Sequence, residues 1–417
     1  MAKGRIKKIL ILIFDILLYL IYGNYFLPII ISSFLTYYFG KKVKTNKNFY
    51  LVSFIYLIVL LPLIFFKYLI NIMEINILIP LGISYYTLCL ISYISDMYHD
   101  RYNPSNNILD FLLYSLYFPC LFIGPINRYN DFSSNTKKIK FNKKDLFNSL
   151  LRICLGLIKK FIIANKLSTI ISVLSSNTSY TGIYVLFGCF IYSIMLYSDF
   201  SGGIDIVLGI SKMFNINLIE NFDKPYLSES VKEFWRRWHI SLGNFLKDYI
   251  YIPLGGNRKG SMSTKINVLL TFLVSGIWHG IHYILWGIIN GILVVINFKT
   301  KNRYLNIFLT FITISLLWIF FIYNNTFLSI NMFISIFDKV DFNLWNLGLN
   351  IWNYIIIIFF LIMVILYELK KDKIDNYLNK LSFNKKICII LLIIFLVLLF
   401  GNYGLDVNSN NFIYGNF

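Results

Sequence analysis

A histidine inside an apolar stretch is the residue of this sequence with the clearest chemical potential. The polar, aromatic segment Glu233–His239 precedes a membrane-like run that contains Ser275-Gly-Ile-Trp-His-Gly280. An ionisable side chain in such a run is costly without a partner or a water-filled cavity, so His279 is a functional candidate. Desolvation favours its neutral form, a base that can take a proton from an alcohol, and the small residues around it leave room for a narrow substrate chain. The alternative is a structural histidine that is hydrogen-bonded to a neighbouring helix.

Two further histidines are candidates for supporting roles. His282 follows His279 by three residues and shares a face with it if the helix is continuous, so it either orients His279 or lies at the mouth of the cavity. His239 stands beside Trp238 and two arginines, a pattern typical of an aromatic belt at a membrane surface. Interfacial anchoring and a role near a charged substrate both stay open for it. His99 is expected in a solvated loop.

Acidic and basic side chains give further candidates. Asp199 and Asp205 are six residues apart in an apolar run, so they do not share one helical face and do not form a general acid/base pair. A structural or cavity-lining role is favoured for Asp199. A basic group contains Arg236, Arg237, Lys247 and Arg258. These residues either attract the phosphates of an anionic donor from the cytosol or anchor lipid headgroups.

The composition places these residues in an integral membrane protein. The chain is 57% hydrophobic and only 14% charged, far from the usage of soluble globular proteins. Apolar runs near the length of a bilayer crossing predict an all-α polytopic protein with roughly ten or eleven transmembrane helices in one domain, residues 1–417. The runs lie at about 9–39 (two short passes), 50–70, 75–95, 108–126, 147–173, 182–210, 267–296, 303–323, 350–368 and 386–403.

The net charge of +19 does not indicate a nucleic-acid-binding protein. The lysines and arginines form short clusters between apolar runs and no continuous basic face, as the positive-inside tendency predicts for a multi-pass protein of the cell membrane. The basic N-terminus leads into an apolar stretch without a small-residue cleavage site, so a retained first helix is expected. The five cysteines lack metal-ligand spacing, and neither a metal site nor a disulfide is indicated.

Two segments interrupt the pattern of simple spans. Residues 213–265 are too polar for a conventional transmembrane helix, and Phe234, Trp238 and Phe245 fall at helical spacing. An interfacial or re-entrant amphipathic helix that ends in a Pro/Gly turn is predicted for this segment. Residues 324–349 are rich in asparagine, and a short surface helix and a loop are predicted there.

An ordered series of motifs resembles the membrane-bound O-acyltransferase (MBOAT) family, and within it the branch that contains the alginate O-acetyltransferase membrane subunit. The motifs are Ile79–Tyr86, Gly124–Phe132, Tyr197–Gly202, Glu220–Tyr226, Glu233–Leu242, Asp248–Arg258 and Ser275–Gly280. The similarity covers most of the chain. The terminal Phe412–Phe417 resembles the aromatic C-terminus of that branch, from which a complete chain is expected.

The resemblance implies a multi-helix fold with a central funnel or tunnel, in which His279 is the principal active-site residue and Trp278 supports it. Such proteins move an acyl group from a cytosolic thioester, acetyl-CoA or an acyl carrier protein, towards an acceptor on the outer face, often through a separate extracytoplasmic transferase. No bound cofactor is expected. Relatives commonly carry a second histidine where this sequence has Asn290, and an asparagine cannot act as a base. The arginine that often follows the paired phenylalanines in the alginate branch is absent near Trp318–Ile322.

Three functions stay open. The first is O-acetylation of an extracytoplasmic cell-envelope polysaccharide, which the Pro-Leu-Gly-Gly-Asn-Arg block within Asp248–Arg258 favours. The second is D-alanyl transfer to teichoic acid from an aminoacyl carrier protein. The third is a transporter or flippase for a lipid-linked glycan, which predicts intramembrane charged pairs or inverted repeats, and neither is evident in the sequence. In the enzyme, His279 either deprotonates the acceptor or carries the acyl group itself.

Overall fold

The computed structural model describes residues 2–22, 26–69, 80, 82–143 and 145–403. This described part of the chain is helical, and its one β-type pairing is an isolated bridge between Phe222 and Trp238. The all-α prediction is therefore confirmed. The motif positions 79 and 81 and the terminal segment 412–417 lie outside the described residues.

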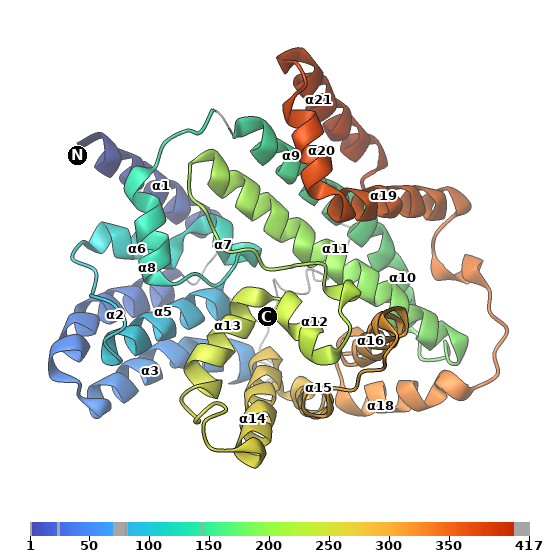
Figure 1. The fold of residues 1–417 in the computed structure, drawn as a ribbon, viewed down its shortest axis with the longest axis horizontal. Coiled ribbons are helices and arrows are strands. Elements are labelled where there is room, and N and C mark those ends of the chain that lie inside the picture. The colour runs from blue at the N-terminus through green and yellow to red at the C-terminus, as the bar shows by residue number, and fades with distance from the viewer. Residues whose placement is uncertain (1, 23–25, 70–79, 81, 144, 404–417) are drawn as a thin grey trace.

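The N-terminal helices form one side of the molecule, coloured blue to cyan in Figure 1. They are α1 (Ala2–Tyr22), α2 (Phe26–Asn46), α3 (Phe49–Ile64) with its π-helical continuation η1 (Phe65–Leu69), α5 (Ile83–Tyr98), α6 (Ile108–Leu116), α7 (Phe118–Ile123) and α8 (Tyr129–Asn135). The apolar run at 9–39 thus contains two helices, as predicted. α3 begins at an Asn48 cap, whose side-chain oxygen accepts from the backbone N–H groups of Tyr50 and Leu51 at 2.9 and 3.3 Å.

A long central helix packs against the helices formed by the middle of the chain. α11 (Ile183–Met213) crosses the centre of the molecule (Figure 1) and packs against α9 (Leu146–Leu157). The two helices touch at glycines, because a Cβ on Gly156 would lie 2.5 Å from the Gly202 carbonyl oxygen. The run predicted at 147–173 is divided, since the π-helix η3 (Ile158–Ala164) joins α9 to α10 (Asn165–Ser176).

The predicted amphipathic segment differs from a single continuous helix. It forms α12 (Val231–Arg237) and α13 (Ile240–Leu246), and the chain turns between them where His239 adopts a left-handed backbone with φ of 46°. The π-helix η5 (Lys247–Tyr251) and a turn rich in glycine follow. Its apolar residues Phe234, Trp238 and Phe245 are buried in the protein core. The prediction of one helix was wrong. The backbone turns at His239, yet the apolar side chains before and after the turn all face the core, so their spacing in the sequence does not reveal the turn.

The apolar run at 267–296 is also divided. α14 (Ser261–His279) ends at Gly280, whose φ of 142° only glycine adopts readily, and the short 3-10 helix η6 (Ile281–Tyr283) leads into α15 (Ile284–Ile296). The two helices pack against each other, at the bottom of the molecule in Figure 1. His279 therefore lies at a helix end inside the protein.

The remaining helices follow in order. They are α16 (Arg303–Leu317), α17 (Ile319–Ile322), α18 (Thr326–Ile334), α19 (Ile351–Leu369), α20 (Lys371–Asn379) and α21 (Phe383–Phe400). α18 and the loop after it match the short helix and loop predicted at 324–349. Phe327 and Phe337 are exposed there at 82% and 84%, so this segment presents apolar side chains on the surface.

Among the residues that the structure describes, five helices are long and apolar enough to cross a membrane. They are Phe49–Leu69, α11, Arg303–Ile322, α19 and α21, and shorter apolar helices cover 108–121, 281–296 and 326–337. The apolar part of α11 is 61% buried inside the protein, whereas that of α21 is 6% buried. α11 is therefore the core helix, and α21 presents an apolar surface suited to lipid. The structure supports an integral membrane protein, and the count of ten or eleven spans stays a prediction.

Candidate active site

His279 lies in a cage of aromatic rings. Its side chain is 4% exposed, and four rings surround it edge to face. The distances from the imidazole centroid are 4.7 Å to Trp278, 5.4 Å to Trp286, 5.6 Å to Phe321 and 6.3 Å to Tyr283. These rings come from α14, α15, α17 and η6, so four elements fix the position of one imidazole. The cage excludes bulk water from the ring faces.

The segment Glu233–His239 reaches the same place. Trp235 of α12 lies 5.5 Å from Trp286, and Trp238 lies 5.4 Å from Trp318, which is itself 5.3 Å from Phe321. The two motifs that the sequence singled out are thus joined by ring contacts although about 40 residues separate Trp238 from His279. This is the arrangement expected of one functional site.

Asn290 connects the same two motifs by hydrogen bonds. Its side chain is completely buried, its Oδ1 accepts from the Trp235 indole Nε1 at 3.0 Å, and its Nδ2 donates to the Trp286 carbonyl at 2.9 Å. Both ends of the amide therefore have a partner. Asn290 can position the cage through Trp235, and it cannot supply a second base.

His239 is buried, not interfacial. Its side chain is 7% exposed and lies edge to face with Phe200 at 4.8 Å, which overturns the alternative of an anchor at the membrane surface. Burial lowers the pKa of His239 to about 3, so the imidazole is neutral near pH 7. A supporting role for His239 stays a prediction.

Lys67 is a member of this site that the sequence analysis missed. It lies in η1, its side chain is 6% exposed, and its Nζ donates to the Trp278 carbonyl. The same ammonium lies 4.9 Å from the centroid of the Trp278 ring. The signal was present in the sequence, because Lys67 is a lone charge within the apolar run at 50–70.

The other predicted supporting residues lie elsewhere. Asp199 is buried in α11 and pairs with Lys160 of η3, which fits the favoured structural role. His282 is exposed in η6, and its backbone carbonyl accepts from Thr326 Oγ1 at 3.0 Å. The helix breaks at Gly280, so His282 does not share a continuous helical face with His279, and the premise for an orienting role was wrong.

The three candidate donor-binding arginines do not line one pocket of the described structure. Arg237 donates to the Glu233 carboxylate at 2.6 Å. Arg236 is exposed and lines an open pocket of about 330 Å³, and Arg258 is exposed in the turn that precedes α14. A shared phosphate site for these residues stays a prediction.

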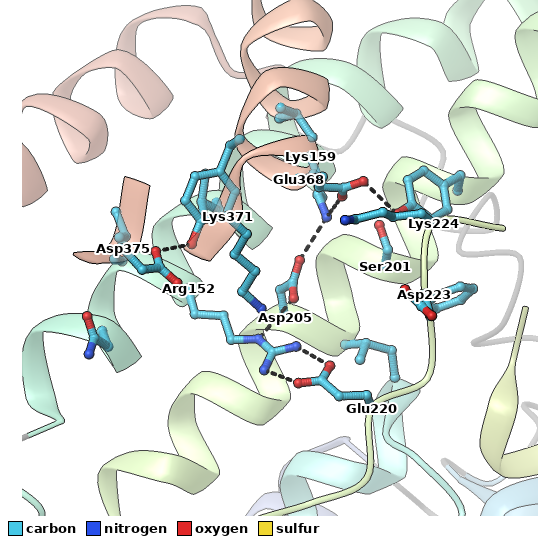
Figure 2. A pocket seen from close by; sticks show the side chains of 18 of the residues that line it. Arg152, Lys159, Ser201, Asp205, Glu220, Asp223, Lys224, Glu368, Lys371 and Asp375 are labelled. Atoms are coloured by element: carbon cyan, nitrogen blue, oxygen red, sulfur yellow. Dashed lines mark hydrogen bonds and ion pairs between the residues drawn. The ribbon is translucent and has the colours of Figure 1, made fainter. Parts of the chain in front are cut away.

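A second polar region lies between α9, η3, α11, α19 and α20 (Figure 2). It is a pocket of about 500 Å³. Arg152 makes two hydrogen bonds to Glu220, at 2.6 and 2.5 Å, and one to Asp205 at 3.0 Å. Lys159 contacts Asp205 at 2.9 Å and Glu368 at 2.6 Å. Figure 2 shows the two cations alternating with the three carboxylates.

These pairs correct an expectation from the sequence, which showed no intramembrane charged pairs. Asp205 lies in the span α11 and Glu368 in the span α19. Asp205 is separated from Lys159 by 46 residues and from Arg152 by 53, and the packing of α9 and η3 on α11 brings them together. Sequence spacing could identify the isolated charges and not their partners.

A series of ring contacts connects the charged pocket to the aromatic cage. Tyr197 lines the pocket and donates to Glu368 at 2.9 Å, while its ring lies 6.2 Å from Trp238. Phe222 lines the pocket too, and its ring lies 5.0 Å from Trp238. Two aromatic side chains thus separate the charged groups from the rings that lead to His279.

Comparison with known proteins identifies the family to which this chain is similar. The model of the MBOAT, membrane-bound O-acyltransferase, family matches residues 99–337. The probable alginate O-acetylase AlgI of Pseudomonas syringae is 35% identical over 282 residues, which cover 66% of this chain and 54% of that protein. The peptidoglycan O-acetyltransferase of Helicobacter pylori is 33% identical over 286 residues, 59% of this chain and 54% of that protein.

A third relative acts with a different acyl group. The teichoic acid D-alanyltransferase of Streptococcus thermophilus is 32% identical over 283 residues, 62% of this chain and 67% of that protein. The matched part of this chain spans about half the length of the alginate and peptidoglycan relatives. The matched family region contains Lys159, the segment Glu233–His239, His279 and Asn290, but not Lys67.

Proposed function

This chain belongs to the membrane-bound O-acyltransferase family, and we propose that it moves an acetyl group from a cytosolic thioester to hydroxyls of an extracytoplasmic cell-envelope polysaccharide. The observation that carries the proposal is the buried His279, held in a cage that joins two of the family-like motifs. By their names, the relatives acylate alginate, peptidoglycan and teichoic acid. Hydroxyl acylation of an envelope polymer is common to them.

The arrangement around His279 suits this chemistry. A thioester carbonyl is already activated, so the protein needs a base, an oriented hydroxyl and the exclusion of competing water. In the proposed step the acceptor oxygen attacks the thioester carbonyl carbon while His279 takes the hydroxyl proton. The C–S bond then breaks, and the leaving thiolate takes this proton from the imidazolium. The products are an ester and a free thiol, and His279 is neutral again.

Donor and partner are part of the same proposal. We assign acetyl-CoA as the donor and the exposed Arg236 and Arg258 as its phosphate-binding residues, whereas Arg237 is engaged by Glu233. A separate extracytoplasmic transferase that passes the acetyl group to the polymer fits a site in a membrane protein. The alternative donor is a D-alanyl carrier protein, with teichoic acid as the acceptor.

The test is thioester consumption by the purified protein in lipid nanodiscs. Acetyl-CoA and a D-alanyl carrier protein are offered separately, and the His279→Ala and His282→Ala variants are compared with the wild type. We expect consumption of acetyl-CoA that His279→Ala abolishes and His282→Ala leaves unchanged. Consumption of the D-alanyl thioester alone would indicate D-alanyl transfer to teichoic acid in place of acetyl transfer. Full activity of His279→Ala would remove the proposed base.

The ion pairs around Asp205 favour one competing function. A transporter for a lipid-linked glycan often carries charged groups within its spans, and the pocket of Figure 2 has such groups. This hypothesis predicts movement of a labelled glycan lipid between leaflets without consumption of a thioester. His279→Ala would not affect that movement, so the same variant distinguishes the two functions.

A further inference from the structure

Two hydrogen-bond donors lie at the end of α14 beside His279. One is the Lys67 ammonium, which donates to the Trp278 carbonyl and lies over the Trp278 ring. The other is the Trp278 indole Nε1, a buried atom that has no hydrogen-bond partner among the described residues. The Trp278 ring is also the nearest of the four rings around the His279 imidazole. Both donors therefore belong to the same site as the base.

The Trp278 indole N–H is unfavourable for folding unless it has a further use. A buried N–H without an acceptor loses the hydrogen bond that water would supply. A buried lysine in an apolar helix loses its hydration, and in such helices ionisable residues mark functional sites. Lys67 stands in the π-helical turn η1, a distortion that is frequent at functional sites. A buried indole N–H without an acceptor, beside an ammonium and a buried base, indicates a ligand that accepts hydrogen bonds and becomes negatively charged.

We propose that the Lys67 ammonium and the Trp278 indole N–H bind the carbonyl oxygen of the reacting acyl group. This inference rests on the proposed acyl transfer. When the acceptor oxygen attacks the carbonyl carbon, the π electrons of the C=O bond move onto the carbonyl oxygen, which becomes an oxyanion. When the C–S bond breaks, they return and the C=O bond forms again. An ammonium has three N–H groups, so it can donate to the oxyanion while it keeps its bond to the Trp278 carbonyl.

A structural role for Lys67 predicts a different pattern. Tyr68 donates from its hydroxyl to the Ile277 carbonyl, one residue before the carbonyl that Lys67 contacts. Both residues thus occupy backbone carbonyls at the C-terminus of α14, where a donor or a cation stabilises a helix. If capping is their whole contribution, removal of either side-chain donor has a similar effect. Tyr68→Phe is therefore the matched control.

The experiment compares four variants in nanodiscs, with the thioester that the wild type consumes. Trp278→Phe keeps an aromatic ring and removes the N–H, and Lys67→Met keeps most of the volume and removes the charge. Lys67→Arg restores a cation, and Tyr68→Phe removes the neighbouring cap. We expect Trp278→Phe and Lys67→Met each to lower kcat roughly 100-fold, the effect of losing one oxyanion donor, with KM for the thioester nearly unchanged. Lys67→Arg should recover part of the loss, and Tyr68→Phe should behave as the wild type.

The outcomes separate this inference from the proposed function. Equal losses in Lys67→Met and Tyr68→Phe, with Trp278→Phe fully active, would overturn the oxyanion role while acyl transfer stands. A rise in KM with unchanged kcat in Trp278→Phe and Lys67→Met would also overturn it, because it indicates ground-state binding. No thioester consumption by the wild type would overturn both. If Lys67→Met does not fold, Trp278→Phe and Lys67→Arg decide the matter.

Discussion

Two regions of the described helical core contain polar side chains, and they differ in whether those side chains are paired with one another. In the pocket between α9, α11 and α19, three carboxylates contact two cations in one network of ion pairs. In the cage around His279, aromatic rings surround a base, a lysine and an indole N–H. In the pocket, each of these five charges is paired with another protein group. The cage keeps one buried donor, the Trp278 indole N–H, without an acceptor among the described residues.

The difference indicates which region performs the chemistry. Buried ion pairs that are mutually satisfied hold helices together, and their removal exposes an uncompensated charge. A catalytic group needs the reverse, because its hydrogen bonds have to form with the substrate in the transition state. We therefore expect changes in the cage to affect activity at nearly constant stability, and changes in the pocket to affect stability first. Four predictions test this comparison.

The largest effect on activity is expected for His279→Ala. Loss of a general base lowers kcat by roughly 10²–10⁴-fold, and the aromatic rings of the cage remain to fill the core. Thioester consumption measures the loss, and thermal unfolding in nanodiscs measures folding. A variant that loses activity only in proportion to its loss of folded protein would make His279 a structural residue.

The largest effect on stability is expected for Lys159→Met. This change leaves Asp205 without Lys159 and Glu368 without its ion-pair partner, and breaking a buried ion pair costs roughly 3–5 kcal/mol. Urea or thermal unfolding in detergent measures the change. The control is Lys371→Met, because Lys371 lines the same pocket and makes no ion pair among the described residues. If Lys159→Met keeps full stability and loses catalysis, the pocket takes part in the reaction and the comparison is wrong.

A smaller and mixed effect is expected for Asn290→Ala. The change leaves the half-buried Trp235 N–H without its acceptor, at a cost of about 1–3 kcal/mol. Because Trp235 contacts Trp286 in the cage, we also expect a lower kcat. The ratio of active to folded protein distinguishes the two effects. An unchanged ratio would show that Asn290 stabilises the fold without positioning the cage.

The smallest effect is expected from the titration of His239. Burial lowers its pKa from 6.5 to about 3, so between these values the unfolded chain binds a proton that the folded protein does not. Stability should therefore fall as the pH drops below about 6.5, by up to about 1.4 kcal/mol per pH unit. Unfolding curves between pH 7 and 5 measure this slope. His239→Asn, which tolerates the left-handed backbone, should have a shallower slope, and an unchanged slope would assign the acid sensitivity to other groups.

Several features of the fold could be predicted from the sequence, and others could not. The all-α class and the apolar helices followed from composition, since only helices satisfy their backbone within a long apolar run. The two helices within 9–39 and the short helix near 326 also agree with the pattern. The breaks at His239 and Gly280 escaped it. Each break turns the backbone while the apolar side chains remain buried, and the spacing of hydrophobic residues does not report such a turn.

The candidate site shows the same division. His279 could be identified because a histidine in an apolar run is costly. The same argument would also have identified Lys67, a lone charge in an apolar run. The supporting role of His282 depended on a continuous helix, which Gly280 interrupts. The role of Asn290 became clear only with its partner Trp235, which is 55 residues away.

By itself the sequence determined the kind of molecule and its principal chemical group. The free-energy cost of a polar side chain in a membrane depends on the apolar residues around it in the sequence, so it can be judged from the sequence alone. Which charges are paired, which rings enclose His279, and where Lys67 lies all depend on the packing of the helices. These are contacts between segments far apart in the chain, and the close packing of helices at small residues such as Gly156 and Gly202 creates them.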